Sequence, residues 1–384
     1  MQALPFATQL LTRLGAEVIK IEPPNGDLGR GSEPAMLDPD GRAIGATFLR
    51  NNLNKRSVVI DLKTNAGRDL VLRLAPRFDI VAENSRAGAM RRLGLGYEDI
   101  KAVHPGVIYA SVSGFGNSGS PYEDRPAFAA VVEAMSGIYD MKRVGDGPPT
   151  PSPVGGLGDI GAALFATIGL LAALRRRDET GEGGYLDIAM FDTMVAITDI
   201  VPNFWSLGLR DGTMAPIILD GFRANDGWFV LQVGREAQFA SLAAILDRSD
   251  WLTDDRFSTR QGWVDHLEAV IRPAVEKWAH GMTRDEACSL LAQSGLAAGP
   301  CLRDDEVVTD EHLRGRNMLV EMQRTDGVEQ PVLIPNSPVR LSGASPRPDT
   351  RVPFLGEHTD EVLRQELHLT EAQLADLRAQ GAIR

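Results

Sequence analysis

The stretch SVVIDLKTNAGRDLVLRLAPRFDIVAEN (57–84) decides the fold, because two short β-branched runs flank one segment of helical periodicity. Runs rich in Val and Ile predict strands, and the segment Ala66–Leu74 between them predicts a helix. Two parallel strands can be joined only by a crossover of this kind. The stretch therefore predicts a β-α-β unit of a parallel sheet.

The same alternation continues through the first half of the chain. Further β-branched runs are EVIKIE (17–22), VIYASV (107–112) and YLDIAM (185–190). The expected helices between them include Phe6–Leu14, Tyr97–Val103 and Asp159–Arg176. We therefore predict an α/β fold, with a doubly wound, mostly parallel, Rossmann-like sheet in a large domain spanning 1–205.

The pattern changes near residues 207–216. The segment GFRANDGWFVLQV (221–233) predicts a hairpin turning at Asp226-Gly227. Helices follow without intervening strands, and Thr283 and Glu286 predict a capping box at the start of one of them. These expected helices are Ala237–Leu246, Val264–Trp278 and Thr283–Ala292. We predict a smaller α+β domain over 210–315.

The last segment, 316–384, returns to short strands. LVEM, PVLIP and PVRLS predict strands, with a turn at Asp326-Gly327, and two polar helices are expected near 358–366 and 370–379. The pattern alone leaves open whether this segment rejoins the first domain.

Composition excludes several classes of protein. The chain is 43% hydrophobic and 24% charged, as globular proteins are, and its net charge of −12 argues against nucleic acid as a partner. Two cysteines, Cys288 and Cys301, favour a reducing compartment, so we expect a cytoplasmic protein. No basic leader precedes the first helix, and the longest apolar run, Ile160–Leu174, is shorter than a bilayer requires. We therefore expect no membrane partner. The six histidines lack metal-ligand spacing, so no metal is expected either.

Asp159 is the candidate for chemistry. It opens the long apolar helix and is flanked by Gly158 and Gly161, which with Gly156 form a literal G-x-G-x-x-G. A dinucleotide fingerprint should follow a strand at the first crossover, whereas this one follows the Pro-rich GPPTPSP. A helix N-terminus favours a carboxylate, so a plain capping role is the alternative. The glycines permit close approach of a ligand, which makes Asp159 a candidate nucleophile.

Two further segments predict a binding surface. Basic residues follow two strands that we expect to be neighbours, in NNLNKRSVVIDLK (51–63) and AENSRAGAMRRLGLGY (82–97). The carboxyl ends of parallel strands are where such sheets bind anions. The Gly/Ser-rich loop SGFGNSGSPYEDRPAF (113–128) is of the kind that lines sites, although a solvated surface explains each segment too.

Taken together, these segments resemble the class III CoA-transferase family, whose members include formyl-CoA:oxalate and carnitine CoA-transferases. The matching stretches span nearly the whole chain in the family's order. They include ATQLLTRLGAEVIKIEPPNGD, NKRSVVIDLKT, RLGLGYEDIKAVHPGVIYASVSGFG, VEAMSG, GDIGAALFATIGLLAALRRRDETGEGGYLDIAMFD and VPFLGEHTDEVL.

The resemblance implies site residues and a fold. The nucleophile of the family corresponds to Asp159, and acyl-CoA and a carboxylic acid are the expected substrates, with no permanently bound cofactor. The positions corresponding to CoA contacts are Gln2, Ala3, Leu62, Lys63, Asn84, Ser85, Arg86, Arg92 and, in a poorly matching loop, Arg125. The family's large domain is built from both chain ends, and two chains interlock as a homodimer, which would return 316–384 to the large domain.

The resemblance also implies a mechanism and its competitors. A covalent aspartyl intermediate splits the exchange into easier steps, and backbone N–H groups of the glycine-flanked turn are expected to stabilise the oxyanions. The related 2-methylacyl-CoA racemases carry a His-Asp pair where this chain has Phe128 and Ala129. A non-catalytic CoA-binding protein is a third alternative.

Three departures from the family pattern bear on these expectations. The chain begins at the Gln-Ala pair, so we expect the family's first strand, which precedes that pair, to be absent from this sequence. Leu4 stands where a glycine is usual in the family. The glycine-rich lid of the formyl-CoA enzyme is missing near 210–225, which argues against oxalate as the acceptor.

Overall fold

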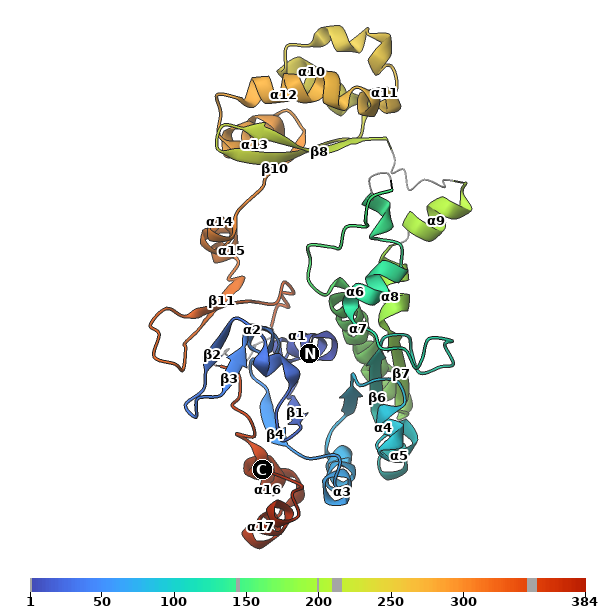
Figure 1. The fold of residues 1–384 in the computed structure, drawn as a ribbon, viewed down its shortest axis with the longest axis vertical. Helices are drawn as coiled ribbons and strands as arrows, with labels where there is room; N and C mark the ends of the chain where they lie inside the picture. The colour runs from blue at the N-terminus through green and yellow to red at the C-terminus, as the bar shows by residue number, and fades with distance from the viewer. Residues whose placement is uncertain (1, 143–145, 199, 209–215, 344–350) are drawn as a thin grey trace. The chain divides into compact units, whose positions relative to one another are not determined.

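The computed structural model describes residues 2–142, 146–198, 200–208, 216–343 and 351–384 (Figure 1). The chain divides into two compact units. Unit 1 combines Met1–Gly208 with Arg314–Arg384, and unit 2 is Leu209–Leu313.

Unit 1 contains two groups of parallel strands. β1 (Ile19–Glu22) pairs with β4 (Arg56–Val59), and β6 (Ile108–Ser113) lies between β5 (Ile80–Glu83) and β7 (Gly184–Ala189). The prediction of a parallel α/β architecture is therefore confirmed. A single doubly wound sheet is not confirmed, because no strand pairing joins β4 to β5 among the described residues.

At some helix starts of unit 1 a side chain satisfies one of the free N–H groups. In α3, for example, the Thr64 hydroxyl accepts a hydrogen bond from the N–H of Gly67 at 3.0 Å. The helices before the second unit are α1 (Ala3–Arg13), α2 (Ala46–Asn51), α3 (Asn65–Leu74), α4 (Ala89–Arg92), α5 (Tyr97–Val103), α6 (Ala129–Met135), α7 (Leu157–Thr180), α8 (Met190–Ile197) and α9 (Ile200–Ser206).

α7 is the central helix of unit 1. One of its faces is buried against α1, α6, α8 and the strands β6 and β7 (Figure 1). It ends at Thr180, and the φ of +74° at the following Gly181 suits a residue without a side chain. Among the described residues it alone is long and apolar enough, by length and composition, to cross a membrane, a test that core helices also pass.

The C-terminal segment attaches to β4. The N–H of Val59 donates to the Thr359 hydroxyl at 3.1 Å, and the N–H of Asp61 donates to the carbonyl of Ala382 at 2.9 Å. α16 (Thr359–Leu367) and α17 (Glu371–Ala379) occur where two polar helices were expected. β11 (Leu319–Met322) pairs with β12 (Val332–Pro335), and β2 (Ala35–Leu37) with β3 (Ala43–Gly45), but the strand expected in PVRLS is not found.

Unit 2 is an antiparallel sheet covered by helices. Its strands run in the order β10 (Ala297–Pro300), β9 (Gly227–Val233) and β8 (Ile218–Ala224). Aromatic side chains fill its core, with the rings of Phe239 and Trp263 stacked 4.4 Å apart. The helices are α10 (Glu236–Ile245), α11 (Arg260–Asp265), α12 (Arg272–Ala279), α13 (Arg284–Gln293) and α14 (Asp304–Thr309), and α15 (Glu311–Gly315) crosses the chain boundary between the two units.

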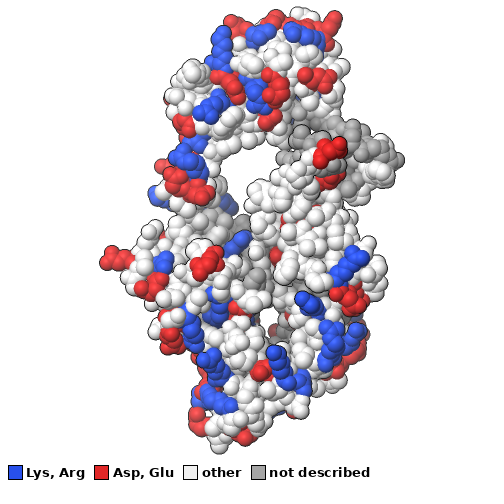
Figure 2. Space-filling view, viewed as in Figure 1, with Lys and Arg blue, Asp and Glu red and all other residues white. Residues whose placement is uncertain are grey.

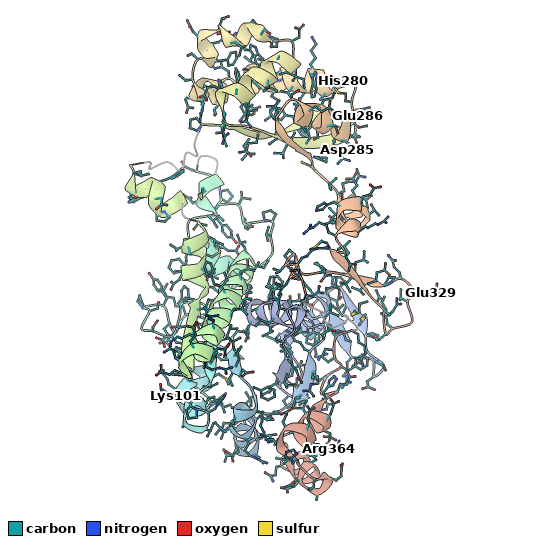
Figure 3. The ribbon with its side chains drawn as sticks, turned by 180° about the vertical axis from the view of Figure 1, so that it is seen from behind. Lys101, His280, Asp285, Glu286, Glu329 and Arg364 are labelled. Atoms are coloured by element: carbon teal, nitrogen blue, oxygen red, sulfur yellow. The ribbon has the colours of Figure 1, made fainter. Side chains whose placement is uncertain are left out.

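Three details of unit 2 differ from the sequence prediction or sharpen it. Ala224 pairs with Gly227, so the hairpin turns at Asn225-Asp226, one residue earlier than predicted. β10 was not predicted at all. The capping box of α13 is confirmed, because the Glu286 carboxylate, labelled in Figure 3, accepts from the N–H of Thr283 at 2.8 Å. The segment 210–225, where the sequence predicted that a glycine-rich lid is missing, lies partly outside the described residues.

Candidate active site

Asp159 lies in the first turn of α7, two residues after the helix begins. The helix is entered through Gly156, whose φ of +78° is a left-handed conformation that residues with side chains adopt only at a cost. The carboxylate of Asp159 therefore lies at the positive end of the helix dipole. Its side chain is half-buried.

The start of α1 lies against this turn. The Gln2 amide donates to the carbonyl of Gly155 at 3.4 Å, and the backbone N–H of Ala3 donates to the Asp159 carboxylate. A Cβ atom added to Gly156 would lie 3.2 Å from Gln2 Nε2 and 3.3 Å from Asp159 Oδ2. The structure therefore brings together three of the predicted site residues, namely Gln2, Ala3 and Asp159.

The pKa of Asp159 is raised above its ordinary value. Burial is the main cause, because removing the carboxylate from water disfavours its charged form. The negative charge of Glu133 adds to the rise, whereas the hydrogen bond from Ala3 opposes it. A carboxylate that is poorly solvated and held by few donors is better suited to nucleophilic attack than one in water.

The glycines beside Asp159 have different partners from those expected. A Cβ at Gly158 would lie 2.9 Å from Val132 of α6, and one at Gly161 would lie 2.8 Å from Thr193 of α8. These two glycines thus permit close helix packing, and Gly156 alone borders the carboxylate. The N–H of Gly158 donates to Glu133, so it is already used and does not serve as the expected oxyanion donor.

The predicted CoA loop Asn84–Arg86 follows β5, and a network of polar side chains stabilises the segment around it. Asn117 accepts from the N–H of Gly88 at 2.9 Å and donates to the hydroxyl of Ser111 at 3.0 Å. Its own N–H donates to Asp187 at 2.8 Å. The sequence analysis missed Asn117, although its position in the Gly/Ser-rich loop 113–128 was a usable signal.

Glu83 belongs to the same network. Its carboxylate accepts hydrogen bonds from the hydroxyl of Ser111 and the N–H of Ser85. Burial raises the pKa of Glu83, and the nearby charge of Asp187 adds to this rise. The network fixes the base of the loop, while the side chains of Asn84 and Arg86 are exposed at its tip.

The basic cluster is only partly available for an anion. Lys55 is buried, and its ammonium group donates to the carbonyls of Pro5 and Asn51 at 2.8 and 2.6 Å. Arg56 lies at the first residue of β4 and pairs with Glu17. Because β4 and β5 belong to different sheets, the expectation that the cluster follows neighbouring strands was wrong.

The remaining cations are on the surface. Lys63 and Arg86 are exposed and form no ion pair within the described ranges, and Arg92 donates to the carbonyl of Ala87 at 3.5 Å. Figure 2 shows Lys and Arg side chains gathered in the region of α4 and α5, among acidic ones. Leu62 packs partly into the core beside Lys63.

Comparison with known proteins identifies the family of this chain. The profile of CoA-transferase family III matches residues 1–359. The chain belongs to this family.

Its relatives within the family are CoA-transferases by name. The chain is 35% identical to the succinyl-CoA–D-citramalate CoA-transferase of Chloroflexus aurantiacus, over 99% of this chain and 94% of the relative. It is 32% identical to the succinyl-CoA:mesaconate CoA-transferase of Haloarcula hispanica, over 94% and 91%. It is also 34% identical to the acetyl-CoA:oxalate CoA-transferase of Acetobacter aceti, over 96% and 93%.

A solved family member has the same fold. The CAIB/BAIF family protein from Brucella suis superposes with a TM-score of 0.82 and 32% identity, over 95% of each chain. The chain is thus an enzyme of the family III CoA-transferase class, whose members use acyl-CoA as a substrate.

Three further positions that the sequence analysis named in this family III chain are Arg125, Phe128 and Ala129. Arg125 stacks over the ring of Tyr122 at 4.4 Å, and Phe128, at one racemase position, is 72% exposed. Ala129, at the other, is buried in the first turn of α6. No group of His, Cys, Asp and Glu able to hold a metal occurs in the part of the chain that the structure describes.

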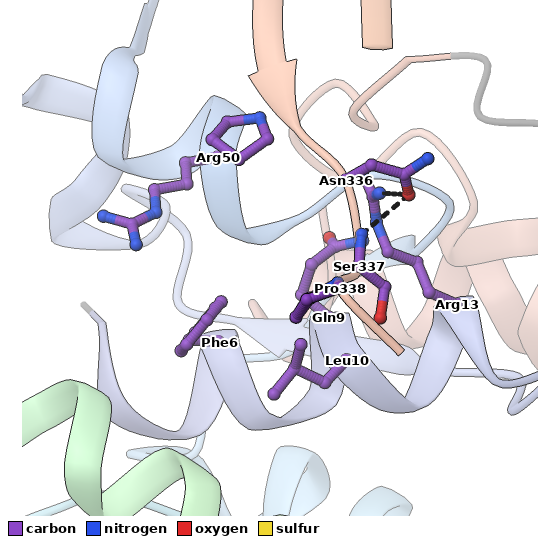
Figure 4. Close-up of a pocket in the computed structure, with 9 residues that line it drawn as sticks. Phe6, Gln9, Leu10, Arg13, Arg50, Asn336, Ser337 and Pro338 are labelled. Atoms are coloured by element: carbon purple, nitrogen blue, oxygen red, sulfur yellow. Dashed lines mark hydrogen bonds between the residues drawn. The ribbon is translucent and has the colours of Figure 1, made fainter. Parts of the chain in front are cut away.

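A pocket on another side of α1 is shown in Figure 4. It is lined by Phe6, Gln9, Leu10, Arg13, Arg50 and 335–338. None of the predicted site residues lines it, so it is distinct from the candidate active site.

Proposed function

We propose that this enzyme moves CoA from an acyl-CoA thioester to a free carboxylic acid, with Asp159 as the covalent nucleophile. The observation that carries the proposal is the half-buried Asp159 carboxylate at the start of α7, bordered by Gln2 and Ala3. In this position the carboxylate is accessible yet poorly solvated, as a nucleophile requires.

The proposed reaction begins with attack by the Asp159 carboxylate on the thioester carbonyl. This forms an aspartyl-acyl anhydride and releases the CoA thiolate. The thiolate then attacks the aspartyl carbonyl, which gives an aspartyl-CoA thioester and frees the first acid. The acceptor carboxylate attacks this thioester, and the two steps run in reverse to release the new acyl-CoA. Each step is an acyl substitution, in which the carbonyl carbon exchanges sulfur for oxygen or oxygen for sulfur. Over the whole cycle one thioester is consumed and one is formed, so no oxidant or reductant is required.

The exposed cations provide the proposed contacts to CoA. Lys63, Arg86 and Arg92 present charges suited to its phosphate groups. We place Asn84 and Ser85 in the same loop, Leu62 beside Lys63, and Gln2 and Ala3 next to the thioester. Arg125, whose guanidinium stacks on the ring of Tyr122, completes the proposed set of contacts.

The names of the relatives suggest small dicarboxylic acids as substrates. Succinyl-CoA is the donor in the names of two of the three, and the acceptors named are D-citramalate, mesaconate and oxalate. We therefore propose a donor and an acceptor of this class. Two free cysteines accord with a cytoplasmic location.

The test is an activity panel in D2O. Wild type and Asp159→Asn are incubated with succinyl-CoA, acetyl-CoA or a 2-methylacyl-CoA, together with mesaconate, citramalate or oxalate. We expect new acyl-CoA species with wild type and a loss of at least about 1,000-fold with the variant. Deuterium entering the α-carbon without any new thioester would instead indicate racemisation.

A further inference from the structure

A second carboxylate lies behind the nucleophile's turn. Glu133, on α6, is 2% exposed. Its Oε1 accepts from the N–H of Gly158 at 3.0 Å, and its Oε2 accepts from the hydroxyl of Tyr139 at 2.5 Å. No Lys or Arg forms an ion pair with it among the described residues. Its charge is therefore balanced by these donors and by the N-terminus of α7.

The contact is possible because α6 and α7 pack closely. The first N–H groups of a helix have no partner within it, and the Glu133 carboxylate supplies one for Gly158. Gly158 lacks the Cβ that would lie 2.9 Å from Val132 and 3.3 Å from the backbone of Ala129. Burial and the charge of Glu133 raise the pKa of Tyr139 to about 12, so its hydroxyl stays protonated as a donor at neutral pH.

We propose that Glu133 is a positioning residue for Asp159. By holding the N–H of Gly158, the residue immediately before the nucleophile, it fixes the first turn of α7 and so the direction of the Asp159 carboxylate. Glu133 does not touch the substrate, and it acts only through this turn. The inference rests on the proposed role of Asp159 as nucleophile.

A positioning role predicts an effect on turnover rather than on binding. A small displacement of the Asp159 carboxylate from its attack geometry slows the covalent step, while the contacts that bind acyl-CoA are unchanged. Loss of the contact should lower kcat on the order of 10- to 100-fold and leave the KM for acyl-CoA within about 2-fold.

The test compares four variants by steady-state kinetics and thermal unfolding. Glu133→Ala removes the acceptor, and Glu133→Asp keeps the charge but shortens its reach by one methylene, so both should show the loss in kcat. Glu133→Gln keeps an acceptor for Gly158 and should retain kcat within about 3-fold. Ser136→Ala is the matched control, since its hydroxyl donates only to the backbone carbonyl of Glu133, and it should behave as wild type.

The outcomes separate this inference from the proposed function. If folded Glu133→Ala or Glu133→Asp protein has wild-type kcat, the inference is overturned. If Glu133→Ala does not fold, the result for Glu133→Asp decides. A rise in KM without a fall in kcat also overturns the inference. Should Asp159→Asn remain fully active, the proposed function itself is wrong, whatever the Glu133 variants do.

Discussion

At the scale of the residue, the sequence analysis singled out Asp159 and its neighbours Gln2 and Ala3, but it did not single out Glu133 or Asn117. Asp159 was predictable because an acid between glycines at a helix start is an unusual pattern. Glu133 was not predictable from pattern, because it contacts a segment distant in sequence. Asn117 was missed for the same reason, although its place in the Gly/Ser-rich loop 113–128 was a usable signal. Helix and loop packing brings them into place, and periodicity carries no information about such contacts.

Asn117→Ala should weaken acyl-CoA binding. The substitution removes the acceptor for the N–H of Gly88 and so loosens the proposed CoA loop. We expect the KM for acyl-CoA to rise about 10-fold with little change in kcat, as a lost hydrogen bond of about 1.4 kcal/mol would produce. Ser118→Ala, whose hydroxyl donates only to Asp187, is the control and should not change KM.

Glu22 makes the stability of unit 1 dependent on pH. Burial alone would raise its pKa. The hydrogen bonds and charge of Arg30, together with the charge of Lys20 and the hydroxyl of Ser57, outweigh burial and hold the pKa below the ordinary value of 4.5. The stabilisation is therefore present above pH 4.5 and is lost as the pH falls through the lower folded-state pKa.

Glu22→Gln should lower the free energy of unfolding at pH 7 by about 3 kcal/mol, because it leaves the buried Arg30 without its charge partner. The difference from wild type should shrink as the pH falls towards acid. Urea unfolding of both proteins at several pH values measures this difference in the free energy of unfolding. A difference that grows in acid would contradict the assignment.

At the scale of the element, most strands and helices follow from local pattern. β-branched runs gave β5, β6 and β7 to within two residues. β10 was missed because Ala297–Pro300 is poor in strand formers and is held by pairing with β9. The segment Val264–Trp278 was predicted as one helix, but a π-helical turn at Leu267–Ile271 interrupts it just before Pro273.

Gly156→Ala should disturb the entry to α7 and the site together. The left-handed φ of +78° costs a residue with a Cβ about 1–2 kcal/mol, and the added atom would press on Gln2 and Asp159. We expect a lower melting temperature and a fall in kcat. Gly155→Ala is the matched control, because nothing lies within 4 Å of its added Cβ. Equal effects from both substitutions would argue against this account.

At the scale of the whole molecule, the sequence predicted parallel α/β structure but not how the strands divide. β1 and β4 form one pair, and β5, β6 and β7 another group, because pairing is decided by tertiary contacts. The C-terminal segment was left open by pattern, and hydrogen bonds tie it to β4.

We propose that two copies of this chain form an interlocked homodimer, as the resemblance to class III CoA-transferases implies. α7 supports this, since Leu164, Phe165, Ile168 and Leu171 form an exposed apolar stripe on it, with Ile168 62% exposed. Analytical ultracentrifugation should give a molecular mass of about twice the 41.6 kDa of one chain. Ile168→Glu should lower this mass towards one chain, whereas Arg175→Ala, on the exposed end of the same helix, should not.

The most direct test of the central claim is mass spectrometry of the enzyme mixed with succinyl-CoA alone, followed by hydroxylamine or borohydride trapping and peptide mapping. We predict a covalent adduct on the peptide containing Asp159, absent from Asp159→Asn. An adduct on another residue, or transfer activity that persists in Asp159→Asn, would contradict the assignment of Asp159 as the nucleophile.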